Sequence, residues 1–154
     1  MIDAVSTFEP PRLHPAKAAH APYEAMIGLD KAVELDAGLR DLVRLRASIL
    51  NGCAYCVDMH TLDARKRGES EQRLYAVAAW HEAPFFDDRE RAALALTDAV
   101  TRVGEGHVPR PVWDEAAAVF DEEELAQLLW AIVAINAWSR IAIATRMEPG
   151  KYEP

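Results

Sequence analysis

The sequence predicts an all-α protein. Apolar residues return every three or four positions along most of the chain, which is the spacing of one face of a helix, and no segment alternates apolar and polar residues over the length of a strand. The 154 residues, 51% of them hydrophobic and 27% charged, have the size and composition of one ordinary globular domain. We therefore expect a single domain over residues 1–154, built as a bundle of helices.

The first 22 residues are predicted to form an extended N-terminal arm. Residues 1–22 show no sustained helical periodicity and contain four prolines, Pro10, Pro11, Pro15 and Pro22. Such an arm would lie on the surface or against a neighbouring subunit. From Tyr23 onward, apolar residues at helical spacing predict a first helix to about residue 35.

Two helices are expected on either side of Asn51-Gly52. Asp36 is suited to cap the first of them, because apolar residues recur at helical spacing over the following residues 39–50. An Asn-Gly pair tolerates the left-handed backbone angles that end helices. The second helix should therefore begin near Cys53 and continue to Lys66 or Arg67.

Four further helices are expected, over residues 70–80, 89–103, 112–120 and 121–147. Pro84 should end the first, and residues 104–111 should form a loop. The last helix is apolar almost all round, which requires burial on more than one side, and a subunit interface would provide it. Polar residues such as Gln127 and Asn136 interrupt it before the roughly 20 apolar residues that a bilayer requires, so we expect no membrane span.

The net charge of −8 argues against nucleic acid and anionic lipid as partners, because both require clustered Lys and Arg. The chain does not start with a basic segment followed by an apolar run, as a secretory signal would. Both cysteines lie in one short motif, so none is left for a structural disulfide framework of the kind found in small secreted proteins. We expect a cytoplasmic protein.

The motif Cys53-Ala54-Tyr55-Cys56, followed by His60, is the candidate functional site. A helix advances about 100° per residue, so Cys53, Cys56 and His60 would share one face. The two thiols could close a disulfide, and backbone amides at the helix start would stabilise a thiolate. Alternatively, the three side chains could bind zinc, although structural zinc requires four ligands and no second Cys/His cluster is present. We expect no metal; two buried cysteines without a chemical role are the remaining alternative.

His60 is the expected acid and base of this site, because the pKa of an unperturbed histidine lies near neutrality. Asp41 is the best-placed carboxylate to complete a proton relay, since a helical hairpin could bring it back towards His60. It could equally pair with Arg44 on a solvated helix face. Asp58 has a helical phase that points away from His60, towards solvent. Tyr55 could line a substrate pocket or only pack in the core.

Several stretches together resemble the AhpD-like branch of the carboxymuconolactone decarboxylase family. They are the residues 42–48 leading into 51–60, then 71–75 and Ala79-Trp80; the likeness runs from about Asp41 to Val100 and resumes at residues 135–138. The resemblance implies an AhpD-like helical bundle, a trimer or hexamer, with the CxxC at the start of a central helix. It also implies a thiol peroxidase that reduces hydroperoxides without a cofactor and is restored by an external dithiol, thioredoxin-like or lipoyl reductant.

In that family an upstream acid, two cysteines and a histidine form a proton relay, and these roles map onto Asp41, Cys53, Cys56 and His60. The second cysteine usually attacks the peroxide, which makes Cys56 the expected peroxidatic residue. Two departures bear on peroxidase activity. The family's acid is commonly a glutamate, and other family peroxidases can carry a histidine between the cysteines where this chain has Tyr55.

The leading hypothesis is therefore an enzyme, an alkylhydroperoxidase-like oxidoreductase that uses the cysteine pair and a His/Asp relay. A cofactor-free decarboxylase of the same broad family is an alternative, but it would give the cysteine pair no role. A non-catalytic oligomer that senses oxidation is the other alternative. A sensor would stop after one equivalent of peroxide, whereas an enzyme would turn over with an added dithiol.

Overall fold

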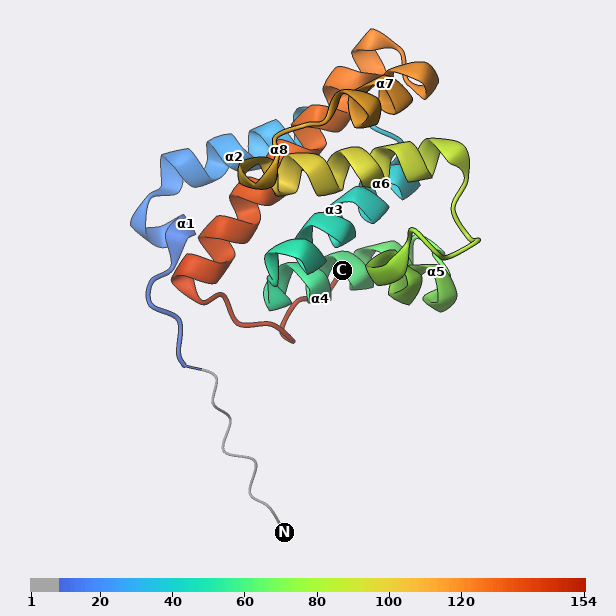
Figure 1. Ribbon diagram of the computed structural model, residues 1–154. Coiled ribbons are helices and arrows are strands. Elements are labelled where there is room, and N and C mark those ends of the chain that lie inside the picture. Colours follow the sequence, from blue (N-terminus) through green and yellow to red (C-terminus); the bar gives the residue numbers. More distant parts are fainter. Residues whose placement is uncertain (1–8) are drawn as a thin grey trace.

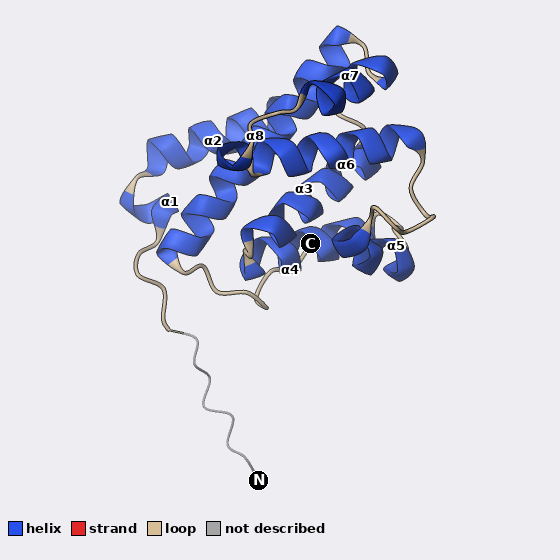
Figure 2. Ribbon diagram, in the orientation of Figure 1, coloured by secondary structure: helices blue, strands red, loops and turns tan. Residues whose placement is uncertain are grey.

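The computed structural model describes residues 9–154 as a helical protein (Figure 1). Its helices are α1 (Pro15–Ala18), α2 (His20–Ala32), α3 (Ala37–Asn51), α4 (Ala54–Lys66), α5 (Glu71–Ala76), α6 (Asp88–Thr101), α7 (Arg110–Val119) and α8 (Glu122–Thr145). Two short 3₁₀ turns, Val77–Ala79 and Val103–Glu105, follow α5 and α6. The described residues contain no strand (Figure 2), which confirms the predicted all-α class.

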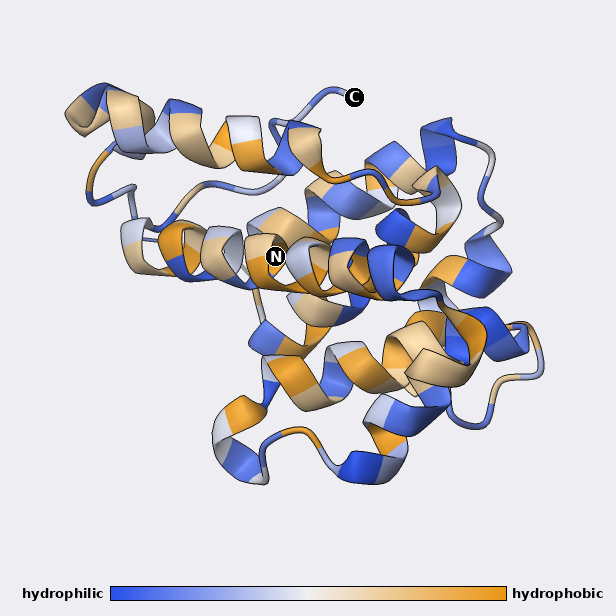
Figure 3. Cartoon of the chain, turned by 90° about the horizontal axis from the view of Figure 1, so that it is seen from above, coloured by the Kyte–Doolittle hydropathy of each residue, from blue (hydrophilic) through white to orange (hydrophobic). Residues whose placement is uncertain are grey.

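Helix α3 lies at the centre of the packing. Helices α4, α6 and α8 all lie against it (Figure 1). One side of α3, with Leu39 and Val43, packs against α6, α7 and α8, whereas Leu42 and Leu45 pack against α4 and α5. Most helices therefore combine an apolar side in the core with a polar side outside, as the mixed colours in Figure 3 show.

The hairpin of α3 and α4 forms as the sequence predicts. The Asp36 side chain accepts a hydrogen bond from the backbone N–H of Leu39 at 3.0 Å and so caps α3. Gly52 ends α3 with a φ of 67°, in the left-handed region that favours glycine. Cys53 is the N-cap of α4, which runs to Lys66. The turn thus places the CxxC motif at the start of α4.

The predicted extended arm is wrong over residues 15–22. Residues 15–18 form α1, and α2 already begins at His20. Pro15 occupies the first position of α1, where the missing N–H costs no helical hydrogen bond, and Pro22 lies in the first turn of α2 for the same reason. Residues 9–14 are not helical, and residues 1–8 of the predicted arm lie outside the described part.

Two other boundaries differ from the predicted ones. The helix expected over 70–80 ends at Ala76 and continues as a 3₁₀ turn to Ala79, in which the chain already bends before Pro84. The loop expected over 104–111 is shorter at both ends, because Val103–Glu105 forms a 3₁₀ turn and α7 starts at Arg110, just before Pro111.

Helix α8 starts with a capping box between Asp121 and Glu124, as predicted, and ends at Thr145. In the described part of the chain it is the single helix long and apolar enough to cross a membrane. Half of that apolar stretch is nevertheless buried inside the protein, as in the core helix of a globular domain. The outer side of α8 exposes four large hydrophobic residues, Trp130, Val133, Ile141 and Ile143.

Candidate active site

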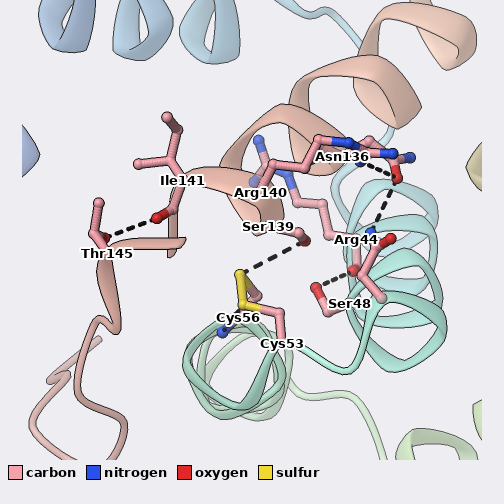
Figure 4. Close-up of a disulfide and its surroundings, with 10 residues drawn as sticks. Arg44, Ser48, Cys53, Cys56, Asn136, Ser139, Arg140, Ile141 and Thr145 are labelled. Atoms are coloured by element: carbon pink, nitrogen blue, oxygen red, sulfur yellow. Dashed lines mark hydrogen bonds between the residues drawn. A yellow bond between two sulfur atoms is a disulfide. The ribbon is translucent and has the colours of Figure 1, made fainter. Parts of the chain in front are cut away.

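The two cysteines form a buried disulfide at the start of α4. Cys53 and Cys56 are 1% and 2% exposed, and their Cα atoms lie 5.3 Å apart. The backbone N–H of Cys56 donates a hydrogen bond to Cys53 Sγ at 3.3 Å. From α8, Ser139 Oγ donates to Cys56 Sγ at 3.7 Å (Figure 4). Each sulfur therefore has one hydrogen-bond donor that would stabilise it as a thiolate after reduction.

His60 lies one helical turn after Cys56 and is 4% exposed. Neither of its ring nitrogens has a hydrogen-bond partner in the described structure. Burial, together with the positive charges of Arg44 and Arg67, lowers the pKa of His60 to about 3. The sequence suggested a histidine that titrates near neutrality. In the structure His60 is instead a neutral imidazole at that pH.

Asp41 makes no hydrogen bond to His60, so the predicted relay has no direct link between these two side chains. Its carboxylate is 3% exposed and accepts two hydrogen bonds from Arg67, from Nε at 2.6 Å and from Nη2 at 2.5 Å. The hairpin does bring Asp41 back towards α4, but it meets the planar guanidinium at the C-terminal end of that helix, which binds both carboxylate oxygens. The alternative pairing with Arg44 is also absent, because Arg44 pairs with Asp30.

A cavity of about 150 Å³ adjoins Cys56 and His60. It lies between α2, α4 and α8, and apart from these two residues it is lined by Tyr23, Ile27, Asp30, Arg44, Tyr55, Met59, Ile135, Trp138, Ala142 and Met147. The walls are mainly apolar, and the two charged side chains neutralise each other in an ion pair of 2.8 Å. Tyr55 lines this cavity; that the cavity takes a substrate stays a prediction.

Cys53 adjoins a second and more open cavity of about 320 Å³. Arg12, Ala54 and Arg146 line it together with the cysteine, and Arg146 pairs with Glu9 at 3.1 Å. Tyr55 and Met147 border both cavities. The two cysteines of one disulfide thus border different cavities. The cavity beside Cys56 is smaller and mainly apolar, and the cavity beside Cys53 is larger, more open and lined by two arginines.

The C-terminal segment is fastened along the outer side of α4. Asp58 accepts a hydrogen bond from the backbone N–H of Gly150 at 2.8 Å, so it points away from His60 as predicted but has a partner in the chain. The Tyr152 hydroxyl donates to Asp63 at 2.8 Å, and burial together with this carboxylate raises the pKa of Tyr152 to about 12. These contacts hold the helix that carries Cys56 and His60.

Sequence reasoning missed four residues at the site, namely Asp30, Arg44, Trp138 and Ser139. All come from helices other than α4. Arg44 and Trp138 lie in stretches that carry the family resemblance, but only the packing of the helices shows that they lie beside the cysteines. In the described part of the chain, no three His, Cys, Asp or Glu side chains come together as metal ligands. The absence of a cofactor remains a prediction.

Comparison with known proteins decides the family. The model of the carboxymuconolactone decarboxylase family matches residues 17–99, more than half of the chain. The chain belongs to this family. The uncharacterized protein YdfG of Bacillus subtilis is 42% identical over 114 residues, which cover 74% of this chain and 78% of YdfG. The uncharacterized protein YnjA of Escherichia coli is 35% identical over 115 residues, covering 71% of this chain and 60% of YnjA.

Solved structures place the chain in the AhpD-like branch of the family. A protein of unknown function from Agrobacterium tumefaciens, named as a candidate antioxidant defence protein AhpD, superposes with a TM-score of 0.90 at 38% identity. The match covers 93% of this chain and 100% of that one. The debrominase Bmp8 has the same fold, with a TM-score of 0.74 at 22% identity over 83% of this chain and 70% of its own. Family membership and the buried cysteine pair indicate an enzyme of this general kind.

Proposed function

We propose that this family member is a thiol-dependent peroxidase that reduces hydroperoxides through Cys53 and Cys56. The observation that carries the proposal is the disulfide itself, which lies beside a neutral, unpartnered His60 at the wall of an apolar cavity. A redox-active pair needs a hydrogen-bonded thiolate, a nearby proton acceptor and access for a small substrate. All three are provided at Cys56.

The reaction begins with the reduced pair. Cys56 gives its proton to His60, and the thiolate attacks the distal oxygen of ROOH; the O–O bond breaks and the leaving alkoxide takes the proton as ROH. Because the site disfavours imidazolium, His60 passes the proton on rather than keeping it. Cys53 then attacks the sulfenic acid on Cys56, releasing water and forming the disulfide. One hydroperoxide thus oxidises two thiols.

The division of the two cavities supports Cys56 as the peroxidatic cysteine. Cys56 shares the smaller, mainly apolar cavity with His60, whereas Cys53 borders the larger and more open cavity, from which a reductant would approach. A thiolate of an external dithiol would attack Cys53 and displace Cys56 as the leaving thiolate. The second thiol of the reductant would then release Cys53 and complete its own disulfide. The pair returns to the dithiol state with two electrons gained.

The assembly and location of the protein follow from the same proposal. We expect a homo-oligomer, because α8 exposes four large hydrophobic side chains that a neighbouring chain could cover. We expect it to act in the cytoplasm, where thiol reductants keep such pairs cycling. No observation favours the decarboxylase alternative, since the cysteines and their donors would have no role in it.

The deciding experiment mixes the reduced protein with tert-butyl hydroperoxide and counts turnovers as a dithiol such as dihydrolipoamide is added. An enzyme consumes many equivalents of peroxide per chain, in proportion to the dithiol supplied. A redox sensor stops after one equivalent and forms the Cys53–Cys56 disulfide. If the reduced protein forms no disulfide with peroxide, the peroxidase proposal is wrong.

A further inference from the structure

Trp138 contains a buried hydrogen-bond donor without an acceptor. In the described part of the chain four buried side-chain nitrogen atoms lack partners: Nε of Arg40, both ring nitrogens of His60, and Nε1 of Trp138. Three of the four therefore belong to two side chains that line the cavity beside Cys56. Buried donors and acceptors are almost always paired in folded proteins, so such a cluster points to a group that is bound there during function.

The indole of Trp138 is held in place rather than free to turn away. The ring of Tyr23 packs edge-on against it, with ring centroids 5.2 Å apart and an interplanar angle of 74°. Trp138 also packs against the small core cluster that contains both cysteines. An N–H fixed in this way is oriented before any ligand arrives, so it loses little freedom when it forms a hydrogen bond.

The cavity defines the chemistry of the missing group. Its volume of about 150 Å³ and its apolar walls suit a body about the size of benzene. The Arg44–Asp30 pair is internally neutralised, so the site requires no net charge on the ligand. The unpaired groups are one N–H donor on Trp138 and a neutral imidazole on His60 that can accept a hydrogen bond. Together they match a hydroxyl or hydroperoxyl group on an apolar body.

We propose that Trp138 orients the substrate by donating its Nε1–H to an oxygen of a neutral organic hydroperoxide. In the bound complex neutral His60 accepts the hydrogen bond of the hydroperoxyl O–H, and it gives this bond up when it takes the proton of Cys56. The apolar body occupies the cavity between α2, α4 and α8. This arrangement holds the O–O bond next to Cys56. The inference rests on the proposed peroxidase function for its substrate, but the alcohol product ROH presents the same oxygen and can be tested without any thiol chemistry.

The experiment uses the intact, disulfide-bonded protein and tert-butanol, the alcohol left by tert-butyl hydroperoxide. The chain has four tryptophans, so its ¹⁵N–¹H spectrum contains four indole N–H signals, and the signal missing from Trp138→Phe identifies Trp138. Titration with tert-butanol should move the Trp138 signal downfield and leave that of the exposed Trp113 in place. If the Trp138 signal of the wild-type protein does not respond, the inference is wrong, whether or not the variant folds.

Affinity measurements separate the hydrogen bond from the shape of the cavity. Trp138→Phe keeps an aromatic wall but removes the donor, so tert-butanol should bind roughly fivefold more weakly, as expected for the loss of one hydrogen bond. Benzene, which has no oxygen to accept it, should bind equally to the variant and the wild type. Trp113→Phe is the matched control outside the cavity and should change neither affinity. If Trp138→Phe lost the same affinity for tert-butanol and benzene, the indole would only fill space, and this result would refute its proposed role as a hydrogen-bond donor.

Discussion

His60 should make the folded protein sensitive to mild acid. Its pKa is about 3 in the folded state and about 6.5 in an unfolded chain. Below pH 6.5 His60 binds a proton in the unfolded chain but not in the folded chain. The free energy of unfolding therefore falls as the pH falls towards 3. The loss follows from burial of an imidazole that has no partner to stabilise its charged form.

The size of the effect can be worked out at a pH where most proteins remain folded. A pH of 5 is about 1.5 units below the pKa of the unfolded histidine, whereas the folded histidine is still neutral at this pH. Each unit corresponds to about 1.4 kcal/mol, so His60 should remove about 2 kcal/mol of unfolding free energy between pH 8 and pH 5. That is a large share of the stability of a typical domain.

Urea denaturation of the oxidised protein at pH 8, 7, 6 and 5 measures this dependence, at one protein concentration so that any self-association contributes equally. His60→Leu fills a similar volume without a titrating group, and its unfolding free energy should fall by about 2 kcal/mol less over that range. The exposed His20, replaced by asparagine, is the control and should keep the wild-type slope. Identical slopes for wild type and His60→Leu would refute the assigned environment of His60.

Three further predictions address the cysteines, the carboxylate and the surface. Cys56→Ser should abolish peroxide consumption, and Cys53→Ser should react once and accumulate a sulfenic acid detectable by mass spectrometry; the reverse pattern would exchange their roles. Asp41→Asn should lower the unfolding free energy by about 2 kcal/mol, because Arg67 loses its partner, and a double-mutant cycle with Arg67→Gln showing no coupling would contradict the pairing. Trp130→Glu should shift the protein to smaller species in sedimentation, without loss of helical circular dichroism; an unchanged oligomer would exclude this surface as the interface.

Local interactions explain why so much of the helix order was predictable. A cap such as Asp36 or Asp121 acts on backbone groups within three residues, and Gly52 ends α3 through its own backbone angle. The predicted arm is wrong for a related reason: proline breaks a helix in its interior, whereas Pro15 stands in the first turn, where proline is accepted. The predicted boundaries are wrong where the helical conformation depends on a residue's position in a turn rather than on its type.

Cys53, Cys56 and His60 share one helix face because of their spacing along the chain, which can be read without a structure. What surrounds them depends on how the other helices pack. The partner of Asp41 is 26 residues away and the hydroxyl at Cys56 is 83 residues away, so no short pattern could reveal either. The protonation state of His60 and the unpaired indole of Trp138 likewise depend on which distant side chains exclude water from the cavity, and that is a property of the packed core.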